Sequence, residues 1–445
     1  MNLFVRESMM RNAVSGGRFG RWALLALAAV LWMVPSFAAS GGDVWITVGA
    51  DAFSSLRDRA QIRHDGRPLE ALETDGPVVL TRVHGADLDA ISEHLHERFQ
   101  RCSGFVYHGS LEEARRHLRQ AIPNQRLGGP IPYVIDQPGL VQSVSTQLDQ
   151  ANILSSITTL STNYNNRYYQ HQSGVDSATW IRDLWAAYAR TRPDVTVELV
   201  QHPGWAQPSV IMTIPGTSLA SEVIVLGGHL DSIASGSSNP NFSAPGADDN
   251  ASGIATVSEV ARAALAAGFR PQRTVKFMGY AAEEVGLRGA GEIADDHLAN
   301  GVDVVAVMQL DMTAFNGSTQ DIFLITDFTN SDLTSFLGQL IDTYLTDLTW
   351  TTTACGYGCS DHAAWHNRGF PAAFAFEARL GQHNNRIHST GDTLGHFGNT
   401  ADHAIKFARL GAAFIVEVGV DAVPALFTDG FESGDVSAWS GSLAP

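Results

Sequence analysis

The sequence is poor in basic side chains. Its 445 residues include 29 Lys and Arg against 46 Asp and Glu, which gives a formal charge of −17 at pH 7. An acidic protein repels the phosphate backbone of nucleic acids and the anionic surface of membranes. We therefore expect neither nucleic acid nor a membrane as a partner, and the composition, 44% hydrophobic, indicates a soluble globular protein.

Long apolar runs are also missing, except for one near the N-terminus. This run spans residues 22–34, follows three arginines and precedes the small-residue motif Ser36-Phe37-Ala38. As a helix it would extend about 20 Å, which is short of a hydrocarbon core about 30 Å thick. The pattern is typical of a signal peptide, so we expect residues 1–38 to be removed on export and the mature protein to be secreted.

Cysteine is scarce as well. Cys355 and Cys359 lie four residues apart, and Cys102 stands alone. In an exported protein a short disulfide loop persists, whereas one cysteine pair without a second pair is a weak zinc pattern. We expect a Cys355–Cys359 disulfide over a metal-binding pair, with Cys102 free or buried.

The segment 39–139 differs in character from the rest. It is rich in charged residues, and Leu88, Ile91, Leu95 and Phe99 recur at the spacing of an amphipathic helix. Four prolines between 123 and 138 indicate a boundary. We expect a small α+β propeptide here, with an accessory domain that has no inhibitory role as the alternative.

From residue 140 onward, short apolar runs alternate with helical patterns. This alternation predicts an α/β domain over 140–422, with a mixed, mostly parallel central sheet flanked by helices on both faces. An acidic, glycine-rich segment, 423–445, is expected to be a flexible tail. The expected strands are 210–214, 223–226, 274–278, 304–310 and 372–376; the expected helices are one segment through 140–153 and then 252–267, 332–346 and 401–418.

Acidic and histidine side chains follow these strands, where ligands of a parallel sheet gather. His229, with Asp231 two residues on, comes after the second strand, and a structural histidine is the ordinary alternative. The adjacent Asp248 and Asp249 open a helix, where one carboxylate could be a simple cap. Two adjacent carboxylates are costly unless a cation neutralises one, which favours a bridging ligand.

Further candidates follow the next strands. Glu283 and Glu284 could divide the work of binding a metal and taking a proton from a metal-bound water, or form a solvated acidic turn. Asp311 ends a strand and His388 lies in a later loop, where a turn cap and a surface histidine are the alternatives. A five-ligand set of oxygen and nitrogen without thiolate suits two zinc ions and a bound hydroxide; its members are His229, Asp249, Glu284, Asp311 and His388.

Taken together, these motifs resemble the secreted bacterial leucyl aminopeptidases of peptidase family M28, which are exopeptidases with two zinc ions. The resemblance covers residues 144–420, with motifs at 227–232, 245–253, 280–289, 309–313 and 355–366. It implies the zinc-dependent exopeptidase fold and peptides with free N-termini as substrates. It further implies that Asp249 bridges the two ions, that His229 and Asp311 complete one site, and that Glu284 and His388 complete the other.

The resemblance also assigns roles around the metals. Glu283 would be the general base that takes a proton from the zinc-bridging water, and Tyr357 would donate a hydrogen bond to the oxyanion. Asp231 would orient His229. The family has a cis peptide after the bridging aspartate, here Asp249–Asn250. Relatives have aspartate where this chain has Asn250, and we expect a modest effect because the residue is not a ligand.

An apolar pocket for the first substrate side chain is implied in the same way, with a preference for large apolar residues such as leucine. Leu380 and His383 stand where relatives have aromatic residues, which leaves the rank order of substrates open. The pocket positions are Met312, Cys355, Cys359, Phe376, Leu380 and Ile387.

Two other functions are compatible with the same fold: a glutaminyl cyclase, which binds one zinc, and a peptidase-like scaffold that has lost its ligands. The five candidate ligands and Glu283 are all present, which favours the aminopeptidase. No repeated or heptad pattern offers a self-complementary surface, so we expect a monomer.

Overall fold

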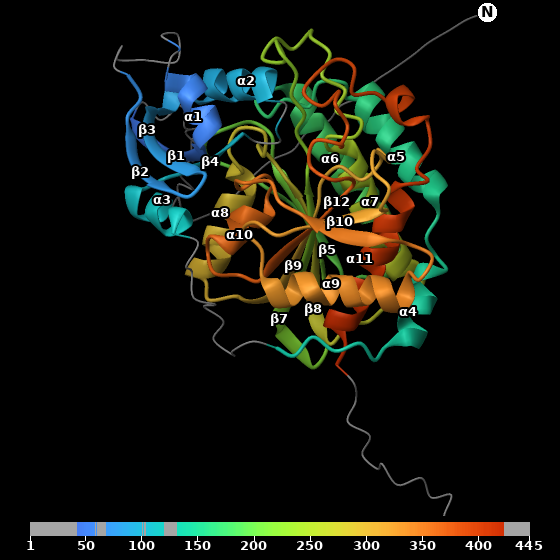
Figure 1. Ribbon diagram of the computed structural model, residues 1–445. Coiled ribbons are helices and arrows are strands. Elements are labelled where there is room, and N and C mark those ends of the chain that lie inside the picture. Colours follow the sequence, from blue (N-terminus) through green and yellow to red (C-terminus); the bar gives the residue numbers. More distant parts are fainter. Residues whose placement is uncertain are drawn as a thin grey trace, which may run out of the picture. The chain divides into compact units, whose positions relative to one another are not determined.

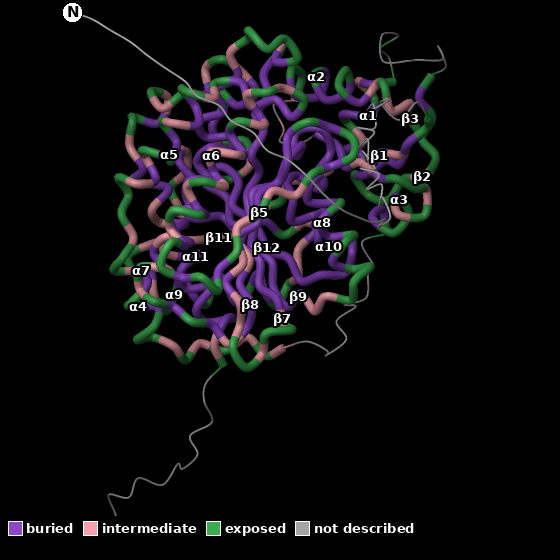
Figure 2. The backbone as a smooth tube through the Cα atoms, turned by 180° about the vertical axis from the view of Figure 1, so that it is seen from behind, coloured by how far each residue is buried: buried purple, intermediate pink, exposed green. Residues whose placement is uncertain are grey.

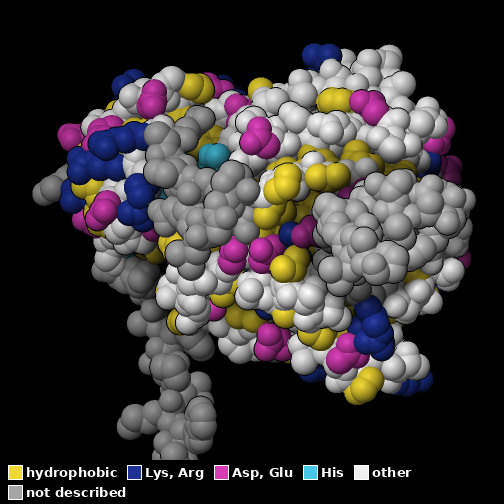
Figure 3. Space-filling view, turned by 90° about the horizontal axis from the view of Figure 1, so that it is seen from below, with side chains coloured by type: hydrophobic (Ala, Val, Ile, Leu, Met, Phe, Trp, Pro, Cys, Tyr) yellow, Lys and Arg dark blue, Asp and Glu magenta, His cyan; other side chains and the backbone are white. Residues whose placement is uncertain are grey.

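The computed structural model describes residues 42–57, 59, 68–99, 101, 104–119 and 131–421. The expected signal peptide, Cys102 and the tail 423–445 lie outside these residues. Within the described part of the chain, no helix has the length and apolar character needed to cross a membrane. On the face drawn in Figure 3, acidic side chains are scattered over the surface and form no single patch.

The core of the larger domain is an eight-stranded sheet whose middle strands are parallel (Figure 1). β7 (Leu219–His229) is central, and β8 (Arg273–Tyr280) and β9 (Asp303–Leu310) pair with it in parallel on its two sides. β12 (Ala372–Phe376) continues the parallel order beside β9. Their nearly continuous apolar sequences explain why these strands are buried on both faces.

The outer strands make the sheet mixed. β6 (Ser209–Ile214) pairs antiparallel with β8, and β5 (Thr196–Val200) pairs antiparallel with β6. On the other side, β10 (Ile322–Ile325) pairs antiparallel with β12. β11 (Trp350–Thr353) completes the order β11-β10-β12-β9-β7-β8-β6-β5. The sequence prediction contained β6, β7, β8, β9 and β12 and missed the other three, because β5 and β11 are half-exposed edge strands and β10 has only four residues.

Helices cover both faces of the sheet, as predicted, and the strands between them are buried (Figure 2). One face carries α8 (Arg288–Ala299) and α10 (His362–His366). The apolar cluster on the other face includes residues of α4 (Pro138–Ser145), α5 (Gln150–Asn163), α6 (Gln172–Tyr188), α7 (Ala251–Ala266), α9 (Ser331–Tyr344) and α11 (Ala404–Gly419). Single turns of 3-10 helix lie at Gly85–Asp87, Ala189–Thr191 and Leu394–Phe397.

The expectation of one helical segment through 140–153 was wrong. The chain forms α4 and α5 instead, with a break before residue 150. Asp149 lies in the break, and its side chain accepts a hydrogen bond from the backbone N–H of Ala151 at 2.9 Å. An aspartate at this position caps a new helix, because it satisfies one of the N–H groups that the first turn leaves unpaired.

The N-terminal segment folds as an α+β unit, as expected. Its four-stranded antiparallel sheet has the order β2-β3-β1-β4. Val78, Leu80, Val106 and Leu118 of this unit belong to the same apolar cluster as residues of α8 and α10. The elements are β1 (Asp43–Gly49), α1 (Ala50–Arg57), β2 (Ala71–Asp75), β3 (Val78–His84), α2 (Leu88–Phe99), β4 (Phe105–His108) and α3 (Leu111–Leu118).

Candidate metal centre

Three adjacent parallel strands deliver acidic and imidazole side chains to one edge of the sheet. His229 is the last residue of β7, Glu283 and Glu284 follow β8, and Asp311 follows β9. The carboxyl ends of parallel strands meet at the same edge, where open α/β sheets bind their ligands. All four side chains are buried, so the groups predicted from sequence form one internal cluster.

Asp249 lies between two histidines. Its Oδ1 is 3.1 Å from Nε2 of His229, and its Oδ2 is 2.9 Å from Nε2 of His388. The same Nε2 of His229 is 3.4 Å from Oδ1 of Asp311, and the same Nε2 of His388 is 3.3 Å from Oε2 of Glu284. Each oxygen of Asp249 therefore faces a different pair of side chains, which is the geometry of a bridging carboxylate.

The facing atoms have no hydrogen-bond partners. Nε2 of His229 and of His388, both oxygens of Asp249 and Glu284, and Oδ1 of Asp311 are buried without one. Buried polar atoms are normally satisfied, and several unsatisfied ones aimed at each other indicate a bound cation. Imidazole nitrogen and carboxylate oxygen are the donors that zinc accepts, so the residues fit a zinc centre.

The electrostatics of the cluster reflect this crowding. Burial opposes the charge of His388, but the carboxylates of Glu284 and Asp249 outweigh it and raise the pKa of this imidazole to about 10. Burial also opposes ionisation of Glu284, yet the pKa of this carboxyl is lowered to about 2, and His388 and His96 are among the groups that lower it. Burial raises the pKa of Glu283 well above its usual range. Glu283 thus has the environment of a proton acceptor whose charged form is not already stabilised.

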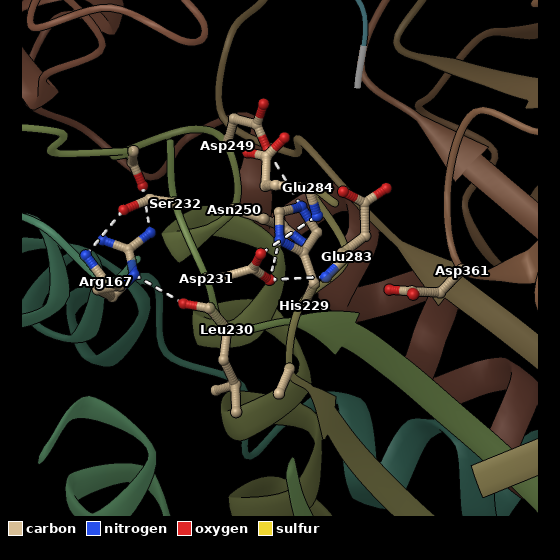
Figure 4. Close-up of polar contacts among 12 residues, drawn as sticks. Arg167, His229, Leu230, Asp231, Ser232, Asp249, Asn250, Glu283, Glu284 and Asp361 are labelled. Atoms are coloured by element: carbon tan, nitrogen blue, oxygen red, sulfur yellow. Dashed lines mark hydrogen bonds and ion pairs between the residues drawn. The ribbon is translucent and has the colours of Figure 1, made fainter. Parts of the chain in front are cut away.

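Asp231 supports the cluster from beneath (Figure 4). Its Oδ1 lies 3.5 Å from Nδ1 of His229. Its two oxygens also accept the backbone N–H groups of Glu283 at 3.0 Å and Glu284 at 3.1 Å. Asp231 is therefore placed to orient the ring of His229, as expected of it. It also holds the turn that carries Glu283 and Glu284.

The loop that carries Asp249 is fixed by groups that the sequence analysis did not single out. Asp392 accepts the backbone N–H of Asp249 at 3.0 Å and that of Asp248 at 3.1 Å. Buried Arg167 donates to the carbonyl of Leu230 (Figure 4). It also donates to the carbonyls of Pro245 and Gly246, close to Asp249 in the chain. No sequence pattern marks Asp392 or Arg167, because their partners are distant in the chain.

Asp248 does not join the cluster. Its Oδ1 accepts the backbone N–H of Ala314 at 3.0 Å, and its Oδ2 accepts the side-chain amide of Asn384 at 3.1 Å. Burial raises the pKa of this carboxyl to about 6. The adjacent pair therefore splits into one carboxylate at the centre and one in a separate buried network.

Asp361 is a further acidic residue near the centre that was not predicted from the sequence. Asp361 is buried, its carboxylate points toward the cluster (Figure 4), and its Oδ1 has no hydrogen-bond partner. Gln309 donates to its Oδ2 at 3.2 Å. The neighbouring Ser360 donates to Oδ2 of Asp311 at 2.7 Å, which leaves Oδ1 of Asp311 directed at His229.

The backbone around the cluster takes uncommon conformations. The peptide bond Asp249–Asn250 is cis, as the resemblance implied. Ala282, Met312 and His388 have φ of 57°, 60° and 56°, and each is, or adjoins, a predicted site residue. Residues other than glycine are rare in this left-handed region of backbone conformation, and those that adopt it concentrate at functional sites.

An apolar cluster contains all six predicted pocket residues, and the Cys355–Cys359 disulfide is present within it. Four of the six line an open pocket, together with Tyr357, whereas Met312 and Ile387 are fully packed inside the cluster. His383, which the sequence analysis named beside Leu380, also lines the pocket. Four further lining residues were not expected: Phe374, Gly381, Phe99 and Arg101.

One histidine at the centre had not been considered. His96, on α2 of the N-terminal unit, places Nε2 at 3.1 Å from Oε2 of Glu284. One ligand atom each from His96, Glu284 and His388 lies within 4.8 Å of the others, as is true of His229, Asp249 and Asp311. His96 follows the apolar Leu95 in a helical pattern and belongs to no motif, so the sequence analysis passed over it.

Comparisons with known proteins agree on one family. Residues 209–413 match peptidase family M28. The probable leucine aminopeptidase of Arthroderma benhamiae is 38% identical over 270 residues, which are 60% of this chain and 72% of that protein. Leucine aminopeptidase 1 of Coccidioides posadasii is 37% identical over 314 residues, 66% of this chain and 78% of that protein.

Solved structures with the same fold include LapB of Legionella pneumophila. It is 28% identical with a TM-score of 0.71, and the match covers 85% of this chain and all of that one. A zinc aminopeptidase from Bacillus subtilis, at 14% identity and a TM-score of 0.52, covers 62% of this chain and 97% of its own and shows the fold alone.

Proposed function

The chain belongs to peptidase family M28, and from this membership we propose that it is a secreted zinc aminopeptidase that releases large apolar residues such as leucine from peptide N-termini. The observation that carries the proposal is the pair of side-chain groups that share Asp249, with buried ligand atoms left unpartnered. Curated relatives are named leucine aminopeptidases, which supports the substrate class.

Two zinc ions would be held by this cluster. His229 and Asp311 would complete one site, Glu284 and His388 the other, and Asp249 would contribute one oxygen to each. Bound zinc lowers the pKa of water toward about 7 and polarises a carbonyl group. Three ligand carboxylates leave the pair of ions with a net positive charge, which suits an anionic nucleophile.

Glu283 is the proton carrier in this proposal. Its carboxylate has no hydrogen-bond partner, it is buried beside the cluster, and its backbone is anchored to Asp231. Glu283 would accept a proton from the attacking water and return it to the leaving amine. Without a competing hydrogen bond, the carboxylate is free to make both contacts in turn.

The pocket lined by Cys355, Cys359, Phe376 and Leu380 would take the side chain of the first residue. Tyr357 lines the same pocket, and its hydroxyl would donate to the oxyanion as the peptide bond is attacked. Apolar walls favour leucine, methionine or phenylalanine, because burial of these side chains gains about 1.5–3 kcal/mol each.

Processing and location belong to the same proposal. Residues 1–38 would direct export, residues 39–139 would be a propeptide, and the peptidase domain of 140–422 would act as a monomer. The tail 423–445 would be a flexible appendage.

The test is hydrolysis of leucine p-nitroanilide by the secreted, processed protein. We expect activity that a chelator abolishes and zinc restores, and no cleavage of N-acetyl-leucine p-nitroanilide, which lacks the free amine. A folded, zinc-loaded, processed protein that cleaves neither substrate contradicts the proposal, and cyclisation of an N-terminal glutaminyl peptide would identify it as a cyclase instead.

A further inference from the structure

Helix α2 of the N-terminal unit reaches the candidate metal centre through one side chain. His96 is only 3% exposed, its Nε2 is 3.1 Å from Oε2 of Glu284, and its ring centroid is 4.1 Å from that of His388. We propose that in the uncleaved chain His96 is a further ligand of the metal that Glu284 and His388 would hold, so that α2 closes this metal to substrate. The inference rests on the proposed function.

The hydrogen bonds of Ser92 identify which ring nitrogen of His96 carries the proton. Ser92 Oγ lies 2.6 Å from the backbone carbonyl of Glu284 and 3.0 Å from Nδ1 of His96. The carbonyl can only accept, so the single hydroxyl proton of Ser92 goes to it. Nδ1 of His96 must then donate to Ser92, which leaves the lone pair of Nε2 directed at Glu284.

A lone pair facing a carboxylate needs a cation between them. Nε2 of His96 and both oxygens of Glu284 are buried and have no hydrogen-bond partner. Two acceptors at 3.1 Å repel each other unless a positive charge lies between them. Histidines that bind zinc characteristically donate their other ring N–H to an oxygen, which fixes the orientation of the ring. For His96 this oxygen is the hydroxyl of Ser92, which accepts from Nδ1.

The remaining contacts of α2 hold His96 in place. Asp89 accepts from the hydroxyl of Tyr169 at 2.5 Å, and Glu93 accepts from the backbone N–H of Gly236 at 3.2 Å. Asp89, Ser92, Glu93 and His96 are spaced i, i+3, i+4 and i+7, which places them on one face of the helix. This face of α2 therefore contacts the loops around the candidate metal centre over two turns.

The end of the same helix lies at the apolar pocket. Phe99 and Arg101 line this pocket, and the guanidinium of Arg101 lies 5.3 Å from the ring centroid of Tyr357. Arg101 also donates to Asp51 at 3.0 Å, which ties it to the N-terminal unit. α2 and Arg101 thus lie against both the candidate metal centre and the pocket. These residues are internal to the chain and offer no free amine to an exopeptidase.

The experiment uses the full chain as wild type, His96→Ala and His94→Ala, each loaded with zinc. His94 is the matched control, because it is buried on the same helix and its Nε2 contacts Ser55 at 2.8 Å, away from the centre. Zinc release into a chromogenic chelator is followed with time. We expect His96→Ala to release one of its two ions faster by about tenfold or more, and His94→Ala to match the wild type.

A second measurement does not depend on a folded variant. In the cobalt-loaded wild-type chain, three paramagnetically shifted histidine N–H resonances are expected, from His229, His388 and His96. Two resonances, or equal release rates from wild type and His96→Ala, would overturn the proposal. If processed protein with two zinc ions has no peptidase activity, the proposed function fails, while the resonance count still decides the role of His96.

Discussion

The side-chain amide of Asn250 donates a hydrogen bond of 3.1 Å to the backbone carbonyl of Leu310. On its other side, Oδ1 of Asn250 accepts the backbone N–H groups of Gly253 at 2.9 Å and Met312 at 3.1 Å. The amide therefore joins the first turn of α7 to the end of β9, which directly precedes Asp311. Asn250 therefore uses the donor and the acceptor of its side-chain amide at the same time.

Asn250→Asp should destabilise the protein, in contrast to the modest effect expected from sequence. A carboxylate at this buried position cannot donate to the Leu310 carbonyl, and it places two acceptors against each other. We expect a loss of about 1–3 kcal/mol in the free energy of unfolding, measured by urea denaturation. Asn241→Asp, at an exposed position, is the control, and equal stability of all three proteins would contradict the prediction.

Glu283→Gln should reduce kcat by roughly 10²–10⁴-fold, because glutamine cannot accept the proton from the attacking water. Glu283 is not one of the five expected ligands, so the zinc content should stay at the wild-type value. Steady-state hydrolysis of leucine p-nitroanilide and metal analysis of the same sample check both statements. Glu198→Gln on the exposed side of β5 is the control; a variant of Glu283 with wild-type turnover would remove this residue from the mechanism.

Removal of the metal should lower the thermal unfolding midpoint. The carboxylates of Asp249, Glu284 and Asp311 are buried together, and without a cation they repel one another. A ligand that binds only the folded state stabilises it in proportion to the logarithm of its concentration. Scanning calorimetry with chelator, and again after zinc is restored, should show a fall and a recovery; an unchanged midpoint in protein shown to be metal-free argues against a metal centre.

Acid should destabilise the protein through His403. Burial, with help from Lys406, lowers the pKa of His403 to about 4 in the folded state, below the value of about 6.5 for an unfolded chain. Its contribution to stability is therefore complete above pH 6.5 and is lost as the pH falls toward 4. In His403→Gln the decline over this range should be shallower by up to about 1.4 kcal/mol per pH unit. Urea denaturation at several pH values measures it, and parallel curves for the two proteins would refute it.

Much of the candidate metal cluster could be predicted because its residues follow strands with a clear sequence pattern. The apolar runs of β7, β8 and β9 predict buried parallel strands. A side chain that directly follows such a strand lies at the edge of the sheet formed by the carboxyl ends of the strands. His229, Glu284 and Asp311 were found in this way. The resemblance then supplied their pairing with Asp249 and His388.

The residues that were missed depend on contacts between distant parts of the chain. His96 lies 188 positions before Glu284. The apolar pattern of α2 predicts which of its residues face the small core of the N-terminal unit. It does not predict which part of the chain contacts the other face of the helix. Arg167 and Asp392 occupy loops of ordinary composition, and their role appears only when the backbone groups that they bind are in place. Side chains that support a site through tertiary contacts have no local sequence pattern.

The docked face of α2 has a consequence for the timing of activity. A group held on the same polypeptide as the site it covers acts at an effective concentration that dilution cannot change, of about millimolar order for short flexible connections. An enzyme that removes residues one at a time from a free N-terminus cannot cut an internal connection in another copy of itself. The onset of activity would then be set by a separate endopeptidase and by how slowly the severed unit dissociates, and this lag would not depend on how concentrated the aminopeptidase is.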